Sequence, residues 1–253
     1  MDLLSLVVVV VAGLLAGAVN SIAGGGSLLL FPALLGVGLP TLTANVTNTV
    51  ANCPGFLGQV WGFAPELRKQ PKHRMIVLSI ATGIGTVIGS ILLLSTSTAA
   101  FNMVVPGLVL FATALLAAQR RLRKLAKTTE PRNGSPLQAA ILPLVLLAAG
   151  IYGGYFGGAL GVIILVALAM TTAEDLRQLN ALKAALSLVD SLISVAIFAT
   201  WGPVNWTAVL AAAPSSLAGG YLGARIARWM NEEALRWSVV TIGCTVSIYL
   251  MIA

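Results

Sequence analysis

The chain has 253 residues, of which 58% are hydrophobic and only 9% are charged, and its formal net charge is +7. Soluble domains carry about 25% charged residues, so this composition excludes a soluble domain of any size and predicts an integral membrane protein. The positive charge lies in short loops between apolar runs, where it determines membrane topology, and it does not indicate a nucleic-acid partner.

Apolar runs of membrane-helix length predict an all-α membrane protein, because a β-barrel would show segments of about ten alternating residues instead. Six runs in chain order are long enough to span or nearly so: Leu42 to Phe63, Met75 to Leu94, Ala100 to Ala118, Leu176 to Thr200, Trp206 to Ala227 and Leu235 to Ile252. The first residues lack the basic n-region of a signal peptide, and we expect them to form a retained membrane segment.

Glycine breaks interrupt two further apolar regions. Gly24 to Gly26 separates the run Leu3 to Ile22 from the short piece Ser27 to Gly38, and Gly153 to Gly158 precedes the short piece Leu160 to Met170. A membrane segment can be broken only where protein or a watery cavity covers its backbone groups, so paired breaks predict the walls of a transporter's binding site. Each broken region is expected to be a hairpin. In the alternative, Leu3 to Ile22 crosses alone and the amino terminus is cytoplasmic.

The two halves of the chain align as a repeat. Asn45 matches Asn180, and Gly85 matches Gly219, so equivalent positions lie 134 or 135 residues apart. Glycine pairs of this kind, at regular spacing in membrane helices, favour close helix packing. The alignment therefore predicts that the chain is an internal duplication.

The duplication divides the chain into a first membrane repeat over residues 1–118, a basic cytoplasmic linker over residues 119–136 and a second membrane repeat over residues 137–253. Basic loops face the cytoplasm, and counting crossings outward from the linker starts Leu42 to Phe63 outside and Leu176 to Thr200 inside. The second repeat is thus expected to be inverted. Each repeat is then a glycine-broken helical hairpin plus three transmembrane helices.

Polar side chains at helical spacing lie on the helix after each hairpin. They are Asn45, Asn48 and Asn52 in the first copy and Asn180, Lys183, Ser187 and Asp190 in the second. Residues at this spacing share one helix face. Asparagine and serine also hold membrane helices together, so a purely structural role stays open for them. An uncompensated charge at bilayer depth costs upward of about 2.5 kcal/mol, so Lys183 and Asp190 are the stronger functional candidates.

The two charged residues are seven positions apart, on one face but about 10 Å apart along the axis, so a direct bond between them is not expected. Lys183 is predicted to contact an anionic substrate, unless it snorkels to the cytoplasmic end of its helix. Asp190 is predicted to be a protonatable coupling group or the partner of an ion pair that the sequence does not identify. Its structural alternative is a hydrogen bond between helices in its protonated form.

The breaks offer a second way to attract an anion. A helix that restarts inside the membrane presents free N–H groups and the positive end of its dipole. The candidate residues are Gly25, Gly26 and Ser27 at the first break, Gly157 and Gly158 at the second, and Asn20 and Tyr155 beside them as side-chain donors. A steric role for the glycines in helix packing remains the alternative.

Catalytic and nucleotide-binding signatures do not occur in the sequence, which lacks G-x-x-x-x-G-K-[ST], H-E-x-x-H and G-x-S-x-G. No enzyme activity, cofactor or metal site is predicted. The single histidine, His73, lies in a basic loop.

The chain resembles a known family in the order and duplicate spacing of its motifs. In the first repeat these are Gly13-Leu14-Leu15-Ala16-Gly17, Gly24-Gly25-Gly26-Ser27, Pro32-Ala33-Leu34-Leu35 and Ala44-Asn45-Val46-Thr47-Asn48, and in the second Gly153-Gly154-Tyr155-Phe156-Gly157 and Asn180-Ala181-Leu182-Lys183. They resemble the two halves of the TauE/SafE sulfite exporter family. That resemblance implies a multi-pass carrier in the inner membrane that exports a small sulfur anion, such as sulfite or the organosulfonate sulfoacetate, by alternating access.

Two other readings stay open. One is a cation or metal-ion transporter built around Asp190, although no second deep carboxylate, histidine or thiolate cluster accompanies it. The other is a membrane enzyme or scaffold that transports nothing. The expected partners of a carrier are the anion and membrane lipid. A homodimer is compatible with a compact carrier, but no motif requires one.

Overall fold

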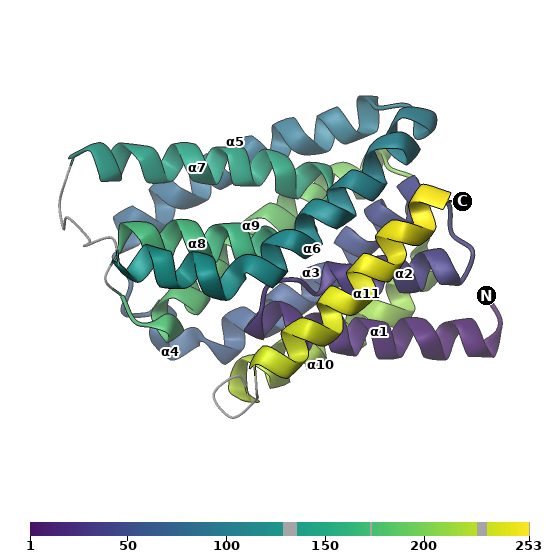
Figure 1. The fold of residues 1–253 in the computed structure, drawn as a ribbon, viewed down its shortest axis with the longest axis horizontal. Helices are drawn as coiled ribbons and strands as arrows, with labels where there is room; N and C mark the ends of the chain where they lie inside the picture. The colour runs from purple at the N-terminus through teal and green to yellow at the C-terminus, as the bar shows by residue number, and fades with distance from the viewer. Residues whose placement is uncertain (129–135, 173, 227–231, 253) are drawn as a thin grey trace.

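The computed structural model describes residues 1–128, 136–172, 174–226 and 232–252, and their regular structure is entirely helical. The helices are α1 (Leu3–Ile22), α2 (Ser27–Gly36), α3 (Thr41–Gly62), α4 (Ala64–Leu67), α5 (Lys72–Ser95), α6 (Thr98–Thr128), α7 (Pro136–Tyr155), α8 (Leu160–Thr171), α9 (Leu176–Trp201), α10 (Trp206–Ile226) and α11 (Glu232–Ile252). The predicted all-α class is confirmed. Figure 1 shows the helices running mostly along the long axis of the molecule.

Four of these helices are long and apolar enough to cross a membrane: α1, the part of α6 up to Leu122, α5 and α9. Shorter apolar helices include α2 and α8. Many large apolar side chains on the long helices are exposed, such as Ile84, Ile88 and Ile91 of α5, which are 51%, 46% and 53% exposed. An apolar outer surface of this kind needs lipid around it. The protein is therefore a multi-pass membrane protein.

Local sequence explains where several helices begin. Asp2 precedes α1 and accepts a hydrogen bond from the Ser5 backbone N–H at 2.9 Å, and Asp175 caps α9 in the same way through Gln178 at 2.8 Å. Such side chains satisfy backbone donors that the first helical turn leaves unpaired. α5 begins directly after Pro71.

Both predicted glycine breaks interrupt the helices where expected. Gly24 and Gly157 have φ angles of 83° and 73°, a left-handed conformation that glycine adopts without a steric cost. Ala159, with φ of 59°, adopts it at the second break despite its Cβ. The chain reverses at each break, so that α2 packs on α1 and α8 packs on α7. Each broken region is thus a helical hairpin.

The connections between helices lie at two opposite ends of the molecule. In Figure 1 both termini lie at one end of the long axis, together with the turn between α5 and α6, whereas α4 and the start of α7 lie at the opposite end. Because α2 returns toward the end that carries the amino terminus, the arrangement matches the predicted hairpin rather than a single crossing by α1.

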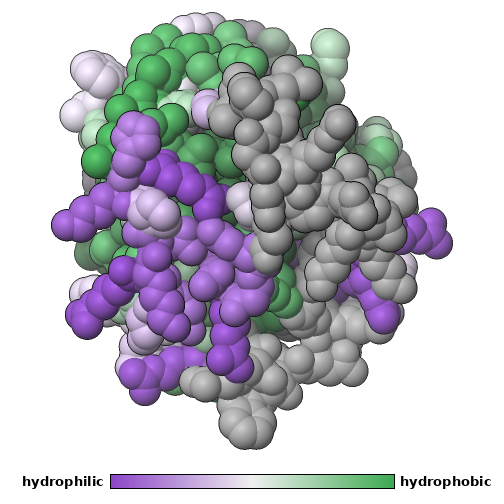
Figure 2. All heavy atoms as spheres, turned by 90° about the vertical axis from the view of Figure 1, so that its left-hand side faces the viewer, coloured by the Kyte–Doolittle hydropathy of each residue, from purple (hydrophilic) through white to green (hydrophobic). Residues whose placement is uncertain are grey.

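The end that carries α4 is rich in hydrophilic residues. Figure 2 looks onto this end and shows hydrophilic side chains gathered on one part of it. Arg68, Lys69, Lys72 and His73 are exposed in the loop between α4 and α5 and in the first turn of α5. The following residue, Arg74, forms an ion pair with Glu174 just before α9, at 2.5 Å. The basic loop predicted from the sequence therefore belongs to this end.

Helices of one half pack mainly against helices of the other half. α1 packs on α10 and α7 on α5, while α3 packs on α10 and α9 on α5. Each of these contacts has a counterpart in the set when the two halves are exchanged. The equivalent helices α3 and α9 pack together in antiparallel fashion, because Val46 approaches Gly202 whereas Phe63 clusters with Ala181. Inversion of the second copy would give this antiparallel packing. The inversion itself remains a prediction.

Glycine permits the closest of these contacts. A Cβ atom on Gly85 of α5 would overlap the Leu147 carbonyl oxygen of α7, and a Cβ on the equivalent Gly219 of α10 would overlap the Leu14 carbonyl oxygen of α1. Small residues let membrane helices approach backbone to backbone. These two glycines hold each hairpin against the other half.

The structure adds detail that the sequence analysis did not predict. α6 continues past residue 118 to Thr128, so the first part of the predicted linker is helical, and residues 129–135 lie outside the described residues. The short helix α4 was not predicted. Arg228, one of the basic residues that favour a cytoplasmic end, also lies outside the described residues.

Candidate functional site

The two glycine breaks meet inside the protein. A Cβ atom on Gly24 would lie 2.8 Å from the carbonyl carbon of Gly161, and one on Gly161 would lie 2.8 Å from the Gly24 Cα. Only two backbones without side chains can approach this closely. The breaks of the two halves therefore form one centre, which we call the break centre and define by Gly24 and Gly161.

Lys183 of α9 reaches this centre. Its side chain is 1% exposed, and its ammonium group donates hydrogen bonds to the carbonyl oxygens of Asn20 at 3.0 Å and Ser21 at 3.1 Å. These carbonyls belong to the last turn of α1, where carbonyl groups lack helical partners and the helix dipole is negative. Lys183 thus compensates the end of a helix that stops inside the membrane, and it does not snorkel to the end of α9.

Asn45 makes a comparable contact in the other half. Its side-chain Nδ2 donates to the carbonyl oxygen of Tyr155 at 3.0 Å, and Tyr155 is the last residue of α7, as Ile22 is of α1. The helix that follows each hairpin therefore caps the broken helix of the other hairpin. The first copy does so with a neutral amide and the second with a charged ammonium.

Asn20 lies at the first break, and its predicted role as a donor to the substrate stays a prediction. Its Oδ1 accepts a hydrogen bond from the Gly26 backbone N–H at 2.7 Å, so this side chain closes the first break and occupies one of the N–H groups at the start of α2. Gly25, Gly26 and Gly158 are buried, and Ser27, Tyr155 and Gly157 are partly buried. The breaks therefore lie within the protein, as the candidate site requires.

A polar seam runs along the contact between α3 and α9. We define it by Asn45, Asn48, Asn52, Asn180, Lys183 and Ser187, none of which is more than 7% exposed. Asn52 Nδ2 donates to Asn48 Oδ1 at 2.8 Å and to the Asn48 carbonyl at 3.1 Å. Four other polar atoms of the seam, the side-chain oxygens of Asn45, Asn52, Asn180 and Ser187, have no hydrogen-bond partner among the described residues.

Unpaired buried atoms at this density need an explanation. Leaving one buried polar atom without a partner costs about 1–3 kcal/mol, and native proteins usually supply water or a ligand at such places. The seam also adjoins the break centre through Lys183. The seam and the break centre together are the candidate binding site.

Asp190 lies on α9 beside the second break. It is 4% exposed, its Oδ1 accepts a hydrogen bond from Thr86 of α5 at 2.6 Å, and a Cβ on Gly153 of α7 would lie 2.5 Å from the same oxygen. Asp190 therefore joins three helices through one carboxylate. Asp190 thus takes part in a hydrogen bond between helices as an acceptor. The protonated form given in its structural alternative and its coupling role both stay predictions.

Comparison with known proteins places the chain in a family. The family model described as "Sulfite exporter TauE/SafE" matches residues 9–250. The chain belongs to the TauE/SafE family. It is 28% identical to a "Probable membrane transporter protein" of Haemophilus influenzae over 239 residues, which cover 94% of this chain and 91% of the relative.

Two further TauE/SafE relatives show similar identity. The "Probable membrane transporter protein YfcA" of Escherichia coli K12 is 26% identical, with 94% of this chain and 86% of the relative covered. The "Probable membrane transporter protein YunE" of Bacillus subtilis is 26% identical, with 95% and 97% covered. No solved structure matches. These names agree with the fold, and the chain is a membrane transporter rather than an enzyme by family.

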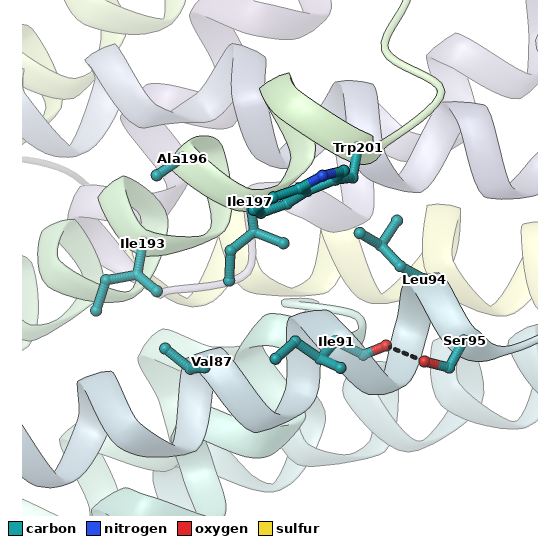
Figure 3. A pocket seen from close by; sticks show the side chains of 8 residues that line it. All are labelled: Val87, Ile91, Leu94, Ser95, Ile193, Ala196, Ile197 and Trp201. Carbon is teal, nitrogen blue, oxygen red and sulfur yellow. Dashed lines mark hydrogen bonds between the residues drawn. The ribbon is translucent and has the colours of Figure 1, made fainter.

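An apolar groove on this TauE/SafE chain is separate from the polar seam. It has a volume of about 550 Å³ and lies between α5 and α9, lined by Val87, Ile91, Leu94, Ser95, Ile193, Ala196, Ile197 and Trp201. Figure 3 shows that its walls are aliphatic apart from Ser95, whose hydroxyl donates to the Ile91 carbonyl at 2.8 Å, and the Trp201 ring. With no charged residue in its lining, the groove does not suit an anion.

The predicted alignment of the two halves points to a difference in packing at the groove. Gly58 and Gly62 let α3 pack closely on α10, whereas the equivalent positions on α9 are Ile193 and Ile197, which line the groove. Likewise, the close approach of Gly220 to Gly55 is replaced in the second copy by the hydrogen bond from Thr86 to Asp190. Bulkier side chains hold α5 away from α9, so the two equivalent helix pairs differ in closeness.

Three polar residues of the site region were missed in the sequence. Thr86 lies on a separate helix, and threonine in an apolar run gives no signal of a hydrogen bond to a distant carboxylate. Ser191, whose Oγ has no partner among the described residues, follows directly after Asp190. Gln59 was recoverable, because it stands seven residues after Asn52 on the same face of α3.

Proposed function

We propose that this TauE/SafE chain is a secondary transporter that exports a small sulfur-containing anion, such as sulfite or sulfoacetate, across the cytoplasmic membrane by alternating access. The observation that carries the proposal is Lys183, a cation buried at the meeting point of two broken membrane helices. A buried charge at this depth usually marks a substrate path. Its sign selects an anion.

The surrounding groups support the same ligand class. The starts of α2 and α8 present backbone N–H groups and positive dipole ends toward the break centre. In the proposed cycle the anion competes with the carbonyl groups of Asn20 and Ser21 for the Lys183 ammonium. Asn180, one turn before Lys183 on α9, then orients the anion, and a protonated oxyanion such as hydrogen sulfite carries a donor for its unpaired oxygen. Asn45 and Asn48 lie toward the opposite end of the contact between α3 and α9, and in the proposed cycle they orient the anion at a different stage of its passage.

Asp190 is the proposed coupling group. An anion path has no need of a carboxylate, but a carboxylate that gains and loses a proton can link anion movement to the proton gradient. The Asp190 side chain touches α5 and α7 as well as its own helix. Protonation would change the hydrogen bond to Thr86, and with it the contact between α5 and α9 at the inner end of the groove.

Flux through proteoliposomes tests the proposal. Purified protein is reconstituted and uptake of sulfite, sulfoacetate, sulfate and a divalent metal cation is measured, with and without an imposed pH gradient. We expect flux of at least one sulfur anion, stimulated by the gradient in the wild type and insensitive to it in Asp190→Asn. Flux of the cation alone would favour a cation transporter, and no flux of any solute would favour a scaffold; either result contradicts the proposal.

A further inference from the structure

Gln59 on α3 is a buried amide side chain without a hydrogen-bond partner in the described part of the chain. It is 1% exposed, and neither its Nε2 nor its Oε1 has a hydrogen-bond partner among the described residues. No other described side chain has both an unpartnered nitrogen and an unpartnered oxygen of one amide. Because each unpaired buried atom is costly, Gln59 lowers the stability of this fold unless another molecule satisfies it.

Its position is on the face of the polar seam. Gln59 follows Asn52 by seven residues and Asn45 by fourteen, which places it on the same side of α3 and about 10 Å further along than Asn52. The next residues, Val60 and Phe63, cluster with Ala181 and Ala184 of α9, which flank Lys183 in sequence. Gln59 therefore lies close to the turn of α9 that carries Lys183.

The duplication shows that the missing partner is specific to the first copy. The position equivalent to Gln59 is Ser194, whose Oγ lies 3.3 Å from the Oγ of Ser90. The position equivalent to Ser90 is Ala224, which lies against Gly62 of α3 and offers only a methyl group. The second half thus has a hydroxyl pair at these two positions, where the first half has an amide and an alanine.

We propose that Gln59 is a second binding station for the transported anion, placed on the α3 side of the polar seam near the Lys183 turn of α9. The Nε2 group donates to an anion oxygen, and Oε1 accepts from a protonated oxygen of the same anion or from a water that accompanies it. A fully apolar side chain of equal length would pack in the same space but could do neither. The inference rests on the proposed function and adds a residue to it.

The test compares stability with transport in the full-length chain. Gln59→Met keeps the length of the side chain and removes both polar atoms, so we expect the melting temperature of the purified protein to stay equal or rise. Uptake of the sulfur anion that the wild type carries is expected to fall about tenfold or more. Gln59→Asn keeps the amide and is expected to retain a larger share of the flux than Gln59→Met.

Leu57→Met is the matched control, because it makes a similar substitution on the same helix at a partly buried position and conserves volume. It should leave flux and melting temperature unchanged. Gln59→Met with wild-type flux would overturn the inference, and so would a parallel fall in flux and melting temperature, since Gln59 would then serve folding. Wild-type protein that carries no sulfur anion would instead contradict the proposed function itself.

Discussion

Lys183 combines two tasks that are usually separate in membrane proteins. Its ammonium satisfies the carbonyl end of α1, and in the proposed cycle the same group receives the anion. The carbonyl oxygens hold the cation in place while the site is empty, so that the charge is not left bare at bilayer depth. To bind, an anion has to interact with the Lys183 ammonium more favourably than these two carbonyl oxygens do.

Replacing Lys183 with Met tests this dual role. The substitution removes two hydrogen bonds but also removes the cost of burying a charge, so folding should change much less than binding. We expect the dissociation constant for the sulfur anion to rise about tenfold or more, which corresponds to about 1.4 kcal/mol, in protein that still melts cooperatively. Lys183→Arg, which keeps the charge, is the control. Equal affinity in folded Lys183→Met protein would remove Lys183 from the site.

At the scale of elements, the contact between the two breaks depends on glycine at both positions. Gly161 adopts an ordinary negative φ, so its requirement for glycine comes from packing against Gly24 and not from backbone strain. The contact lets α1 and α8, from different halves, share the centre of the protein.

Gly161→Ala should separate the breaks. The added methyl group would lie 2.8 Å from the Gly24 Cα, and overpacking against a backbone that cannot yield costs about 1–3 kcal/mol. We expect a lower melting temperature and a loss of transport. Gly107→Ala is the matched control, since no atom lies within 4 Å of a Cβ there. Thermal unfolding of both variants in detergent measures the difference, and equal melting temperatures would refute the packing role of Gly161.

The sequence predicts well those structural features that depend on residues close together in the chain. Glycine runs located both breaks to within a few residues, and the spacing of Asn45, Asn48 and Asn52 identified the buried face of α3. The uses of individual side chains were less predictable. Asn20 Oδ1 accepts a hydrogen bond from Gly26 across the first break, and Asp190 accepts one from Thr86, 104 residues away. The second contact depends on which helices the tertiary fold places together.

At the scale of the whole molecule, the charge pattern predicts which end faces the cytoplasm. The loop before α5 is basic and exposed, and the turn between α5 and α6 is uncharged and lies at the opposite end, together with both termini. The structure shows that these two ends lie opposite each other. The positive-inside rule, applied to the sequence, assigns the basic end to the cytoplasmic side of the membrane.

Labelling of single cysteines tests the orientation. In a chain whose Cys53 and Cys244 are replaced, Lys69→Cys should react with a membrane-impermeant maleimide only from the cytoplasmic side, and Ser97→Cys only from outside. A cysteine placed before Met1 is expected to react from outside, because α1 and α2 form a hairpin. Reaction of that cysteine from the cytoplasmic side would show that α1 crosses the membrane alone.

The exchange of partners between the halves has a consequence for how the protein is made. α1 enters the membrane early, but the helix that covers it, α10, is synthesised close to the end of the chain. Until then the small residues of α1 face lipid without their partners. The first half is therefore inserted into the bilayer before α10 is available to cover α1. A chain truncated before α10 is expected to be degraded by membrane proteases and not to act as a smaller carrier.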